Sequence, residues 1–266
     1  MRSWKVVVAG LGTVGMPTAE YIAGVEGVSV YGYDIVMKKS EKFPTTTNWD
    51  ELPHEDIDVY VIAVWTGLRD GKPDLSALED VLKKIARANP DALISVESTV
   101  PVGALRRFAN ELGLRRLVHV PHRYWAGDPE RHGVRQLRVL GALNDESLAM
   151  GVEFYQHLDI PLHIVSSLEV AEMTKIAENA YRFVQIAFAE ELRMICESLS
   201  LDFEEVRRAA NTKWNIEILE ARDGIGGMCL PKDIRYLRYV AELNTPLLNG
   251  AIEADESYKL WIRKKG

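Results

Sequence analysis

The sequence predicts an α/β protein, in which a doubly wound and mainly parallel sheet is followed by an all-helical domain built on one long helix. Short apolar runs alternate with amphipathic helical segments in the first part of the chain, the pattern of a parallel sheet with covering helices. A glycine-rich turn follows the first apolar run, and residues 169–199 contain no glycine or proline. We therefore expect an α/β domain over residues 1–165 and a helical domain over residues 166–266.

Apolar periodicity defines the elements of the α/β domain. Continuous apolar runs predict buried strands, and apolar residues on one helical face, such as Leu78, Leu82 and Ile85, predict helices that cover the sheet. We expect strands at 5–9, 28–33, 57–64, 92–96, 117–120 and 137–140, and helices at 16–22, at 74–88 and from residue 103 to about 112. Residues 65–67 and the polar insert 69–73 are expected to form loops.

The helical domain is organised around the predicted helix at 169–199, which is longer than the mean of about 11 residues for globular helices. Its apolar residues cover more than a narrow stripe, so we expect it to pack on several sides, as a domain core or a dimer interface. Asp202 is the expected N-cap of a short helix at 203–211, and residues 234–242 and 247–261 also have helical patterns.

The composition is that of an ordinary globular protein and narrows the classes of partner. Of the 266 residues, 47% are hydrophobic and 27% charged, and the formal net charge is −7. The negative charge argues against nucleic acid or an anionic membrane as the main partner. No apolar stretch approaches the ~20 residues that span a bilayer. Two cysteines, Cys196 and Cys229, cannot build a disulfide framework, which favours a reducing cytoplasmic compartment.

The glycine-rich turn has the pattern G-x-G-x-x-G, with Gly10, Gly12, Val14 and Gly15 between the first strand and the first helix. Asp34 stands 19 residues after Gly15, at the end of the second strand. This arrangement predicts a Rossmann dinucleotide site, in which the pyrophosphate rests on the helix N-terminus and the acid binds the adenosine ribose. An acid rather than an arginine favours NAD over NADP. The alternative is a plain glycine turn with a solvated aspartate.

Further polar residues fall at the carboxyl ends of predicted strands. Thr66 follows the third strand and Thr99 the fourth, so both are expected at the sheet edge that carries Gly10 and Asp34. Ligands of doubly wound sheets bind at this edge. We therefore expect the ligand site there.

A second candidate site lies in the helical domain, where Cys229 follows Gly226 in the stretch GGMCLPKD. A thiol attacks as the thiolate, which nearby positive charge favours, and the stretch brings Lys232 and Asp233 close to it. The alternative is a loop with a buried, inert cysteine. Cys196 lies in an apolar helical stretch without such neighbours, so we expect it to serve packing only.

Lys175 and Asn179 are four residues apart on the long helix and therefore share a face. Polar side chains on helices are usually solvated, which is the alternative interpretation. Amid so much apolar surface, however, a buried lysine or asparagine would need polar partners. The histidines show no metal-ligand spacing, so no metal is expected.

Together these motifs resemble those of the UDP-glucose/GDP-mannose dehydrogenase family, most closely its UDP-N-acetylmannosamine dehydrogenase-like branch. The similar runs are the glycine motif with Asp34 and the segments at 97–103, 172–182, 210–212 and 226–233, in the family's order. The resemblance implies NAD as cofactor and a nucleotide sugar, such as a UDP-hexose, as substrate, whose C6 alcohol is oxidised in two steps to a carboxylate. It also implies a homodimer formed through the long helix.

The resemblance also implies roles for single residues. Cys229 would capture the aldehyde as a thiohemiacetal that becomes a thioester, while Lys175 and Asn179 would bind substrate and stabilise the oxyanion. Asp233 and Thr99 would position water or transfer protons. Cofactor contacts are expected for Lys39, Thr66, Thr99 and Lys232, and substrate contacts for Arg123 and Gly226.

Two departures from the family pattern leave the activity open. His122, in the segment Pro121-His122-Arg123, stands where the family has a glutamate associated with substrate binding and proton transfer. Family members also carry a third, nucleotide-binding domain after the helical one. A separate chain would then supply that half of the cleft, or the sequence is a fragment, or the substrate is smaller. A single-step 3-hydroxyacid-type dehydrogenase and a non-catalytic NAD-binding or partner subunit are the alternative functions.

Overall fold

The computed structural model of the protein describes residues 3–265 and divides the chain into two compact units. The first unit comprises the residues up to Arg69 together with Pro73–Lys175, and the second comprises Asp70–Lys72 and the residues from Ile176 onward. The division falls inside the long helix, and the boundary expected between residues 165 and 166 stays a prediction. Within residues 3–265, no helix combines the length and the apolar character needed to cross a membrane.

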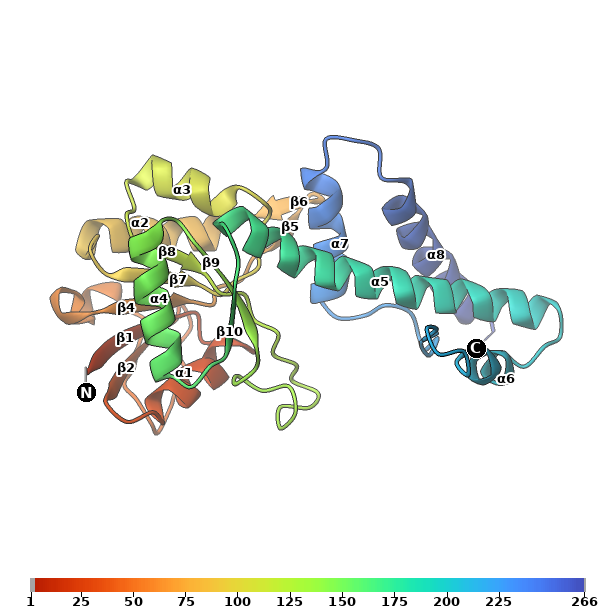
Figure 1. Ribbon diagram of the computed structural model, residues 1–266, viewed down its shortest axis with the longest axis horizontal. Helices are drawn as coiled ribbons and strands as arrows, with labels where there is room; N and C mark the ends of the chain where they lie inside the picture. The colour runs from red at the N-terminus through yellow and green to blue at the C-terminus, as the bar shows by residue number, and fades with distance from the viewer. Residues whose placement is uncertain (1–2, 266) are drawn as a thin grey trace. The chain divides into compact units, whose positions relative to one another are not determined.

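The first unit is built on a sheet whose strands are β1 (Trp4–Ala9), β2 (Val28–Tyr33), β3 (Thr45–Thr46), β4 (Val59–Ile62), β7 (Leu93–Val96), β8 (Leu117–His119), β9 (Arg138–Ala142) and β10 (Leu162–Ile164). Within the described residues these eight strands lie in the order β10-β9-β8-β7-β4-β1-β2-β3; Figure 1 labels all of them except β3. Neighbouring strands are parallel except β8 and β9, which are antiparallel. The predicted parallel-dominated sheet is therefore confirmed.

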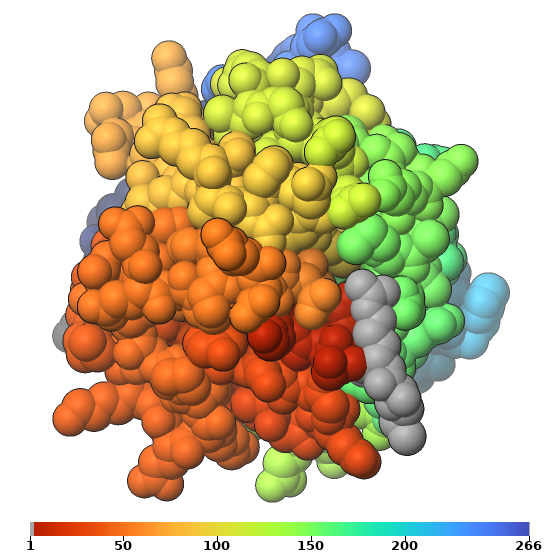
Figure 2. Space-filling model, turned by 90° about the vertical axis from the view of Figure 1, so that its left-hand side faces the viewer, coloured from red at the N-terminus to blue at the C-terminus, as the bar shows by residue number. Residues whose placement is uncertain are grey.

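Helices cover both faces of this sheet, as Figure 1 shows. They are α1 (Gly15–Ala23), α2 (Ser76–Ala88), α3 (Ala104–Leu112) and α4 (Asp145–His157). Val7 and Ile62 point into an apolar core with α2 and α3, whereas Val6 and Val8 point into a second core with α1 and α4. The alternation along β1 therefore supplies both cores, as in a buried parallel sheet. On the surface of this unit in Figure 2, the red and orange N-terminal segments meet the yellow of α2 and α3 and the green of α4.

Several elements were not predicted from the sequence. α4 covers one sheet face, and β3 and β10 form the two edges of the sheet. The residues expected to be loops after β4 contain a hairpin of β5 (Gly67–Arg69) and β6 (Lys72–Asp74). Asp70 and Gly71, the two turn residues, both have positive φ, at 52° and 74°. Asp-Gly favours this hairpin turn, so the polar insert is a tight turn between strands.

The second unit is helical, and its elements are α5 (Leu168–Ser198), which starts in the first unit, α6 (Phe203–Ala210), α7 (Cys229–Val240) and α8 (Pro246–Arg263). The predicted long helix is confirmed. Asp202 is the N-cap of α6, as expected, because its carboxylate accepts hydrogen bonds from the amides of Glu204 and Glu205.

The start of α7 was predicted wrongly. The helix begins at Cys229, five residues before the expected start at 234. Pro231 and the glycines before it indicated a loop, but Pro231 lies in the first turn, where a missing amide removes no helical hydrogen bond. Cys229 is therefore the first residue of a helix.

α5 is buried on one side and exposed on another. Ala180 and Phe183 pack into the apolar core of the second unit, with α7 and α8. Tyr181, Phe188 and Ile195, each seven residues apart, are 67%, 55% and 49% exposed. In the single chain, an apolar stripe of α5 therefore remains uncovered.

Candidate active site

The glycine turn between β1 and α1 requires glycine at two positions. Gly10 has a φ of +92°, and a Cβ there would lie 2.6 Å from the Ala63 carbonyl oxygen. A Cβ on Gly15 would lie 1.8 Å from the Gly10 oxygen, whereas Gly12 faces open space. Val14 occupies the N-cap position of α1. The turn therefore packs tightly against the end of β4 and leaves its backbone accessible at Gly12, as a phosphate-binding turn requires.

Asp34 follows β2 directly and holds this turn. One carboxylate oxygen accepts a hydrogen bond from the Leu11 amide at 2.7 Å, and the other accepts one from the Val36 amide at 2.9 Å. Ile35, Val36 and Met37 are 81%, 58% and 58% exposed. Each carboxylate oxygen retains a lone pair for a ribose hydroxyl, and the apolar side chains beside it offer a surface for an adenine ring. These residues fit the dinucleotide that the glycine pattern predicts.

Hydroxyl groups tie together the carboxyl ends of β4 and β7. Thr66 Oγ1 donates to the Thr99 carbonyl oxygen at 2.7 Å, and Ser98 Oγ donates to the Val64 carbonyl oxygen at 2.7 Å. Thr66 is buried and Thr99 is half-buried. The structure therefore brings Thr66 and Thr99 together at the sheet edge where the sequence placed them.

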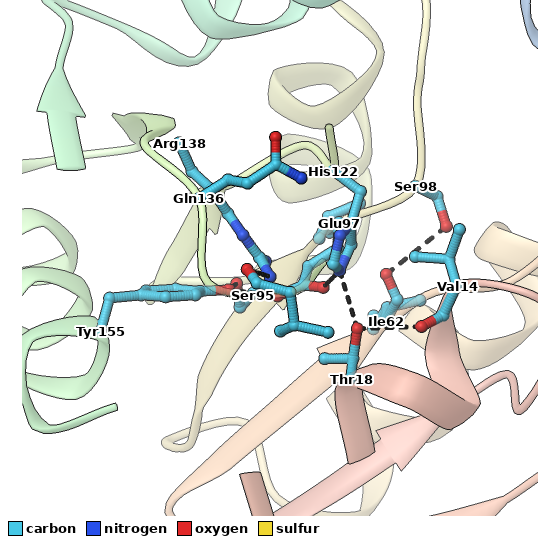
Figure 3. A network of polar contacts seen from close by, with 12 residues as sticks. Val14, Thr18, Ile62, Ser95, Glu97, Ser98, His122, Gln136, Arg138 and Tyr155 are labelled. Carbon is cyan, nitrogen blue, oxygen red and sulfur yellow. Dashed lines mark hydrogen bonds and ion pairs between the residues drawn. The ribbon is translucent and has the colours of Figure 1, made fainter. Parts of the chain in front are cut away.

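A buried polar network lies directly after β7 (Figure 3). The Glu97 carboxylate accepts hydrogen bonds from Arg138 Nη1 at 2.9 Å and from Tyr155 Oη at 2.6 Å. It also pairs with His122 Nε2. Because Tyr155 donates its proton to Glu97, it accepts a hydrogen bond from Ser95 Oγ, at 2.7 Å. Burial opposes ionisation of Glu97, but the facing His122 and Arg138 outweigh burial and hold its pKa at about 2, below the ordinary 4.5.

His122 joins this network to α1. Its Nε2 lies 2.8 Å from Thr18 Oγ1, and Thr18 donates its own proton to a carbonyl of the preceding turn at 2.9 Å. We therefore assign the ring hydrogen of His122 to Nε2. Burial lowers the pKa of His122, and the charges of Arg138 and Lys175 lower it against the attraction of Glu97. His122 is thus a buried donor that links α1 to Glu97.

His119, at the end of β8, is a second buried histidine. Its Nδ1 lies 2.9 Å from the Val96 carbonyl oxygen, and its Nε2 has no hydrogen-bond partner among residues 3–265. Burial lowers the pKa of His119 to about 4, and the positive charge of Lys175 contributes. Lys175 acts electrostatically on both histidines, so this predicted site residue lies close to the carboxyl end of β8.

Glu172, near the start of α5, caps another helix. Its carboxylate accepts hydrogen bonds from the amides of Gly103 at 2.6 Å and Leu105 at 3.0 Å, at the N-terminus of α3. Gly103 has no side chain with which to cap α3, so Glu172 supplies the acceptor from a distant part of the sequence. Burial raises the pKa of Glu172 to about 7, against the lowering effect of these two hydrogen bonds.

In the second unit, Asn179, Lys232 and Asp233 form one cluster. Asn179 Nδ2 donates to Asp233 Oδ2 at 2.5 Å. Lys232 Nζ lies 2.8 Å from Asp233 Oδ1, at an angle that makes the contact an ion pair without a directional hydrogen bond. Lys232 Nζ also lies 4.5 Å from the centre of the Tyr236 ring. Asp233 is fully buried, and the cluster gives it the donor and the opposite charge that a buried carboxylate needs.

Cys229 is exposed at the start of α7, whereas Cys196 is buried in α5. Cys229 and Asp233 are one helical turn apart. Gly226 and Gly227 precede the thiol, and a Cβ at either position would meet no atom within 4 Å. The predicted contrast between an accessible and a packed cysteine is therefore confirmed, and the accessible thiol adjoins open glycine backbone.

The predicted site residues fall into two groups, one in each unit. The group in the first unit is Gly10, Gly12, Val14, Gly15, Asp34, Lys39, Thr66, Thr99, Arg123 and Lys175. The group in the second unit is Asn179, Gly226, Cys229, Lys232 and Asp233. Lys39 is exposed, and Arg123 Nη1 donates to the Leu137 carbonyl oxygen at 2.8 Å. Contacts of either residue with ligands, and the joining of the two groups in one catalytic site, stay predictions.

Sequence analysis missed the polar partners inside the first unit. Arg138 and Tyr155 both bind Glu97, yet Arg138 lies in a segment predicted only as a strand, and no element was predicted around Tyr155. For Arg138, one feature of the sequence could have predicted a buried partner. An arginine inside an apolar strand needs a buried anion as partner.

Comparison with known proteins identifies the class of enzyme and then the family. Residues 35–159 match the NAD binding domain of a dehydrogenase family, and the matching relatives are named as dehydrogenases, so the chain is an NAD-dependent oxidoreductase of the class that acts on CH–OH groups. Residues 169–257 match the central domain of the same family. The chain belongs to the UDP-glucose/GDP-mannose dehydrogenase family, as its motifs predicted.

Relatives in this family include two UDP-N-acetyl-D-mannosamine dehydrogenases. The Campylobacter jejuni enzyme is 27% identical over 98% of this chain, and the Pyrococcus horikoshii enzyme is 30% identical over 86%. The chain spans 74% and 62% of their lengths. The solved structure of UDP-D-ManNAc dehydrogenase from Pyrococcus horikoshii superimposes with a TM-score of 0.87 at 28% identity, covering 98% of this chain and 70% of that one.

A second structural relative shares the fold alone. The Mycobacterium tuberculosis 3-hydroxyisobutyrate dehydrogenase superimposes with a TM-score of 0.73 at 14% identity, covering 99% of this chain and 94% of that one. The fold is thus common to more than one group of dehydrogenases.

Proposed function

We propose that the chain is an NAD-dependent nucleotide-sugar 6-dehydrogenase or its catalytic half, and that it oxidises a UDP-hexose to a uronate through a thioester on Cys229. The relatives named as UDP-N-acetyl-D-mannosamine dehydrogenases make UDP-N-acetyl-D-mannosamine the first substrate to test. The observation that supports the mechanism most is the exposed Cys229 thiol, one helical turn before Asp233 and its partners. A single-step dehydrogenase needs no thiol.

The glycine turn and Asp34 would hold the cofactor. Gly12 offers open backbone at the N-terminus of α1 for the pyrophosphate, and Asp34 has free lone pairs for the ribose. Bound NAD would accept one hydride from the substrate carbon in each of two oxidations. The apolar residues after Asp34 would contact the adenine.

Cys229 would link the two oxidations. After the first oxidation, the thiolate adds to the aldehyde carbon, a carbon–sulfur bond forms and the carbonyl oxygen takes a proton, giving a thiohemiacetal. The second oxidation removes a hydride from that carbon and a proton from its hydroxyl, giving a thioester. Water then adds to the thioester carbonyl, the carbon–sulfur bond breaks and the thiol is regenerated with the carboxylate product. One water molecule and two NAD are consumed for each uronate formed.

Asp233 would act by orienting its neighbours. One Nδ2 hydrogen of Asn179 is donated to Asp233, so the second hydrogen has a fixed direction and remains available for a substrate oxygen. The buried Asp233 also fixes the Lys232 ammonium near the start of α7. Lys175 would add positive charge to stabilise the oxyanion, a role that the resemblance implies.

The stoichiometry of NADH tests the mechanism. Purified chain would be incubated with UDP-N-acetyl-D-mannosamine and NAD, alone and together with a candidate chain that carries a nucleotide-binding domain. We expect two NADH for each uronate, and loss of uronate formation in Cys229→Ser. Cys196→Ala is the matched control, because it removes the buried thiol and should leave the stoichiometry at two. One NADH per substrate in the unmodified chain would select the single-step alternative, and NAD binding without turnover in either mixture would select the non-catalytic one.

We also propose a homodimer formed through α5. Tyr181, Phe188 and Ile195 repeat every seven residues along an exposed stripe of this helix. A seven-residue apolar repeat suits packing against a second helix. The solution mass of the purified chain tests this assembly.

A further inference from the structure

Two side chains of α8 bind both backbone polar groups of Ile225, in the loop before Cys229. The Ile225 amide donates to Asp255 Oδ1 at 2.8 Å, and the Ile225 carbonyl accepts from Lys259 Nζ at 2.7 Å. Lys259 Nζ also pairs with Asp255 Oδ2 at 2.7 Å. These contacts form a closed ring around one residue, which fixes both the position and the direction of the chain there.

Gly224 makes room for this ring. Its φ is +92°, and a Cβ there would lie 2.6 Å from both Cγ and Cε of Lys259. The stem of Lys259 therefore lies across bare glycine backbone, and any side chain at position 224 would displace it. The first glycine of the stretch thus serves the ring at Ile225.

The thiol lies midway between two fixed points of the chain. Ile225 is four residues before Cys229, and its side chain is 3% exposed in the apolar core of the second unit. Asp233 is four residues after Cys229 and is fixed by Asn179. Gly226, between Ile225 and Cys229, has no side chain that could fix this part of the loop. The contacts at Ile225 are therefore what restrains the segment that leads to Cys229.

Glu190 of α5 faces the same pair of side chains. It is fully buried, and neither of its carboxylate oxygens has a hydrogen-bond partner among the described residues. Burial raises the pKa of Glu190 to about 7, the charge of Asp255 raises it too, and the charge of Lys259 lowers it. Lys259 is therefore the cation next to two buried carboxylates, and its loss would disturb both.

From this geometry we infer that Asp255 and Lys259 are positioning residues for Cys229, holding the loop so that the thiol keeps one orientation. The consequence for catalysis rests on the proposed role of Cys229 as nucleophile. The positioning itself does not, because it concerns the loop and the accessibility of its thiol.

The test measures the loop and the thiol separately from turnover. Amide hydrogen exchange would be followed at Ile225 and at buried residues of α5, and the rate of alkylation of Cys229 by iodoacetamide would be followed by mass spectrometry. Lys259→Met removes the cation and Lys259→Arg retains it. Glu253→Gln and Lys264→Met alter exposed charges of the same end of the chain and are the matched controls.

In Lys259→Met we expect Ile225 exchange to accelerate at least about tenfold and the Cys229 alkylation rate to change at least about threefold, while buried α5 amides change less. Lys259→Arg should restore most of both rates, and the two controls should match the unmodified chain. Asp255→Asn keeps the shape of the side chain and the acceptor for the Ile225 amide, but it removes the negative charge that pairs with Lys259. It should therefore also accelerate Ile225 exchange, and it replaces Lys259→Met in the test if that variant does not fold.

Unchanged Ile225 exchange in both Lys259→Met and Asp255→Asn, or a Cys229 alkylation rate that does not change in Lys259→Met, would overturn the inference. Equal acceleration at Ile225 and throughout α5 would also overturn it, because that result indicates general destabilisation. If the variants respond as expected but the unmodified chain oxidises no nucleotide sugar, the proposed function fails and the positioning stands.

Discussion

Replacing Glu97 by glutamine should destabilise the first unit much more than removing an exposed ion pair does. Glu97 and Arg138 each have about 1% of the side chain exposed, and their closest atoms lie 2.9 Å apart. Glutamine keeps the shape but leaves the Arg138 guanidinium buried without a counter-charge, a change that costs about 3–5 kcal/mol in comparable pairs. Glu146→Gln is the control, because Glu146 pairs with Arg116 at the surface, with 56% and 30% of the side chains exposed. Its loss should cost at most about 1 kcal/mol.

The same carboxylate predicts a pH dependence with a definite sign. The pKa of Glu97 in the folded unit is about 2, below the ordinary 4.5, so its stabilising contribution is complete above pH 4.5 and is lost as the pH falls toward 2. The difference corresponds to about 3 kcal/mol. Amide exchange of β7, measured at several pH values in that window, reports the free energy of opening this unit. If Glu97→Gln and Glu146→Gln have equal effects, or if Glu97→Gln keeps the full acid sensitivity, the assigned ion pair does not carry the stability described.

Three further predictions concern other buried or uncovered groups. The pKa of His119 is lowered to about 4, so its neutral form stabilises the fold above pH 6.5, and about 3 kcal/mol of the free energy of unfolding is lost as the pH falls from 6.5 toward 4. In His119→Gln, the free energy of unfolding measured in urea should therefore depend less on pH between 6.5 and 4. The pKa of Glu172 is raised to about 7, so stability falls as the pH rises from 4.5 to 7, and Glu172→Gln should remove that slope. Glu172→Ala should in addition cost about 1–2 kcal/mol and speed exchange of the Leu105 amide, whose hydrogen bond it deletes. Phe188→Glu puts a charge on the exposed α5 stripe, so light scattering should give the mass of one chain for this variant and of two for Glu191→Gln; equal masses would contradict the proposed interface.

The parts of the protein that the sequence predicted well are those set by local pattern. The glycine turn and Asp34 have a spacing that the backbone itself imposes, because a tight turn, a helix and a second strand separate them by a nearly fixed number of residues. α5 was predictable because no residue within it breaks a helix. The contrast between Cys229 and Cys196 followed from their neighbours in the chain.

The parts that the sequence did not predict depend on contacts between distant segments. The pairing of Glu97 with Arg138 requires that β9 run antiparallel beside β8, a placement that no local pattern in residues 117–142 encodes. The start of α7 was missed because Pro231 is compatible both with a loop and with the first turn of a helix. The contacts of His122 likewise join distant segments, because Thr18 of α1 and Glu97 after β7 lie on either side of it.

Buried carboxylates in this protein lie beside segments that carry its motifs. Glu97, the first residue of the motif after β7, faces Arg138, and Ile225, in the loop before Cys229, is held by Asp255 and Lys259. A well-packed apolar group is often as stable as a buried ion pair, so stability alone does not explain such pairs. A charge-assisted hydrogen bond does, however, fix direction as well as distance. The second pair acts directly on backbone, and its rupture should therefore alter local exchange and thiol reactivity more than the free energy of unfolding of the whole unit.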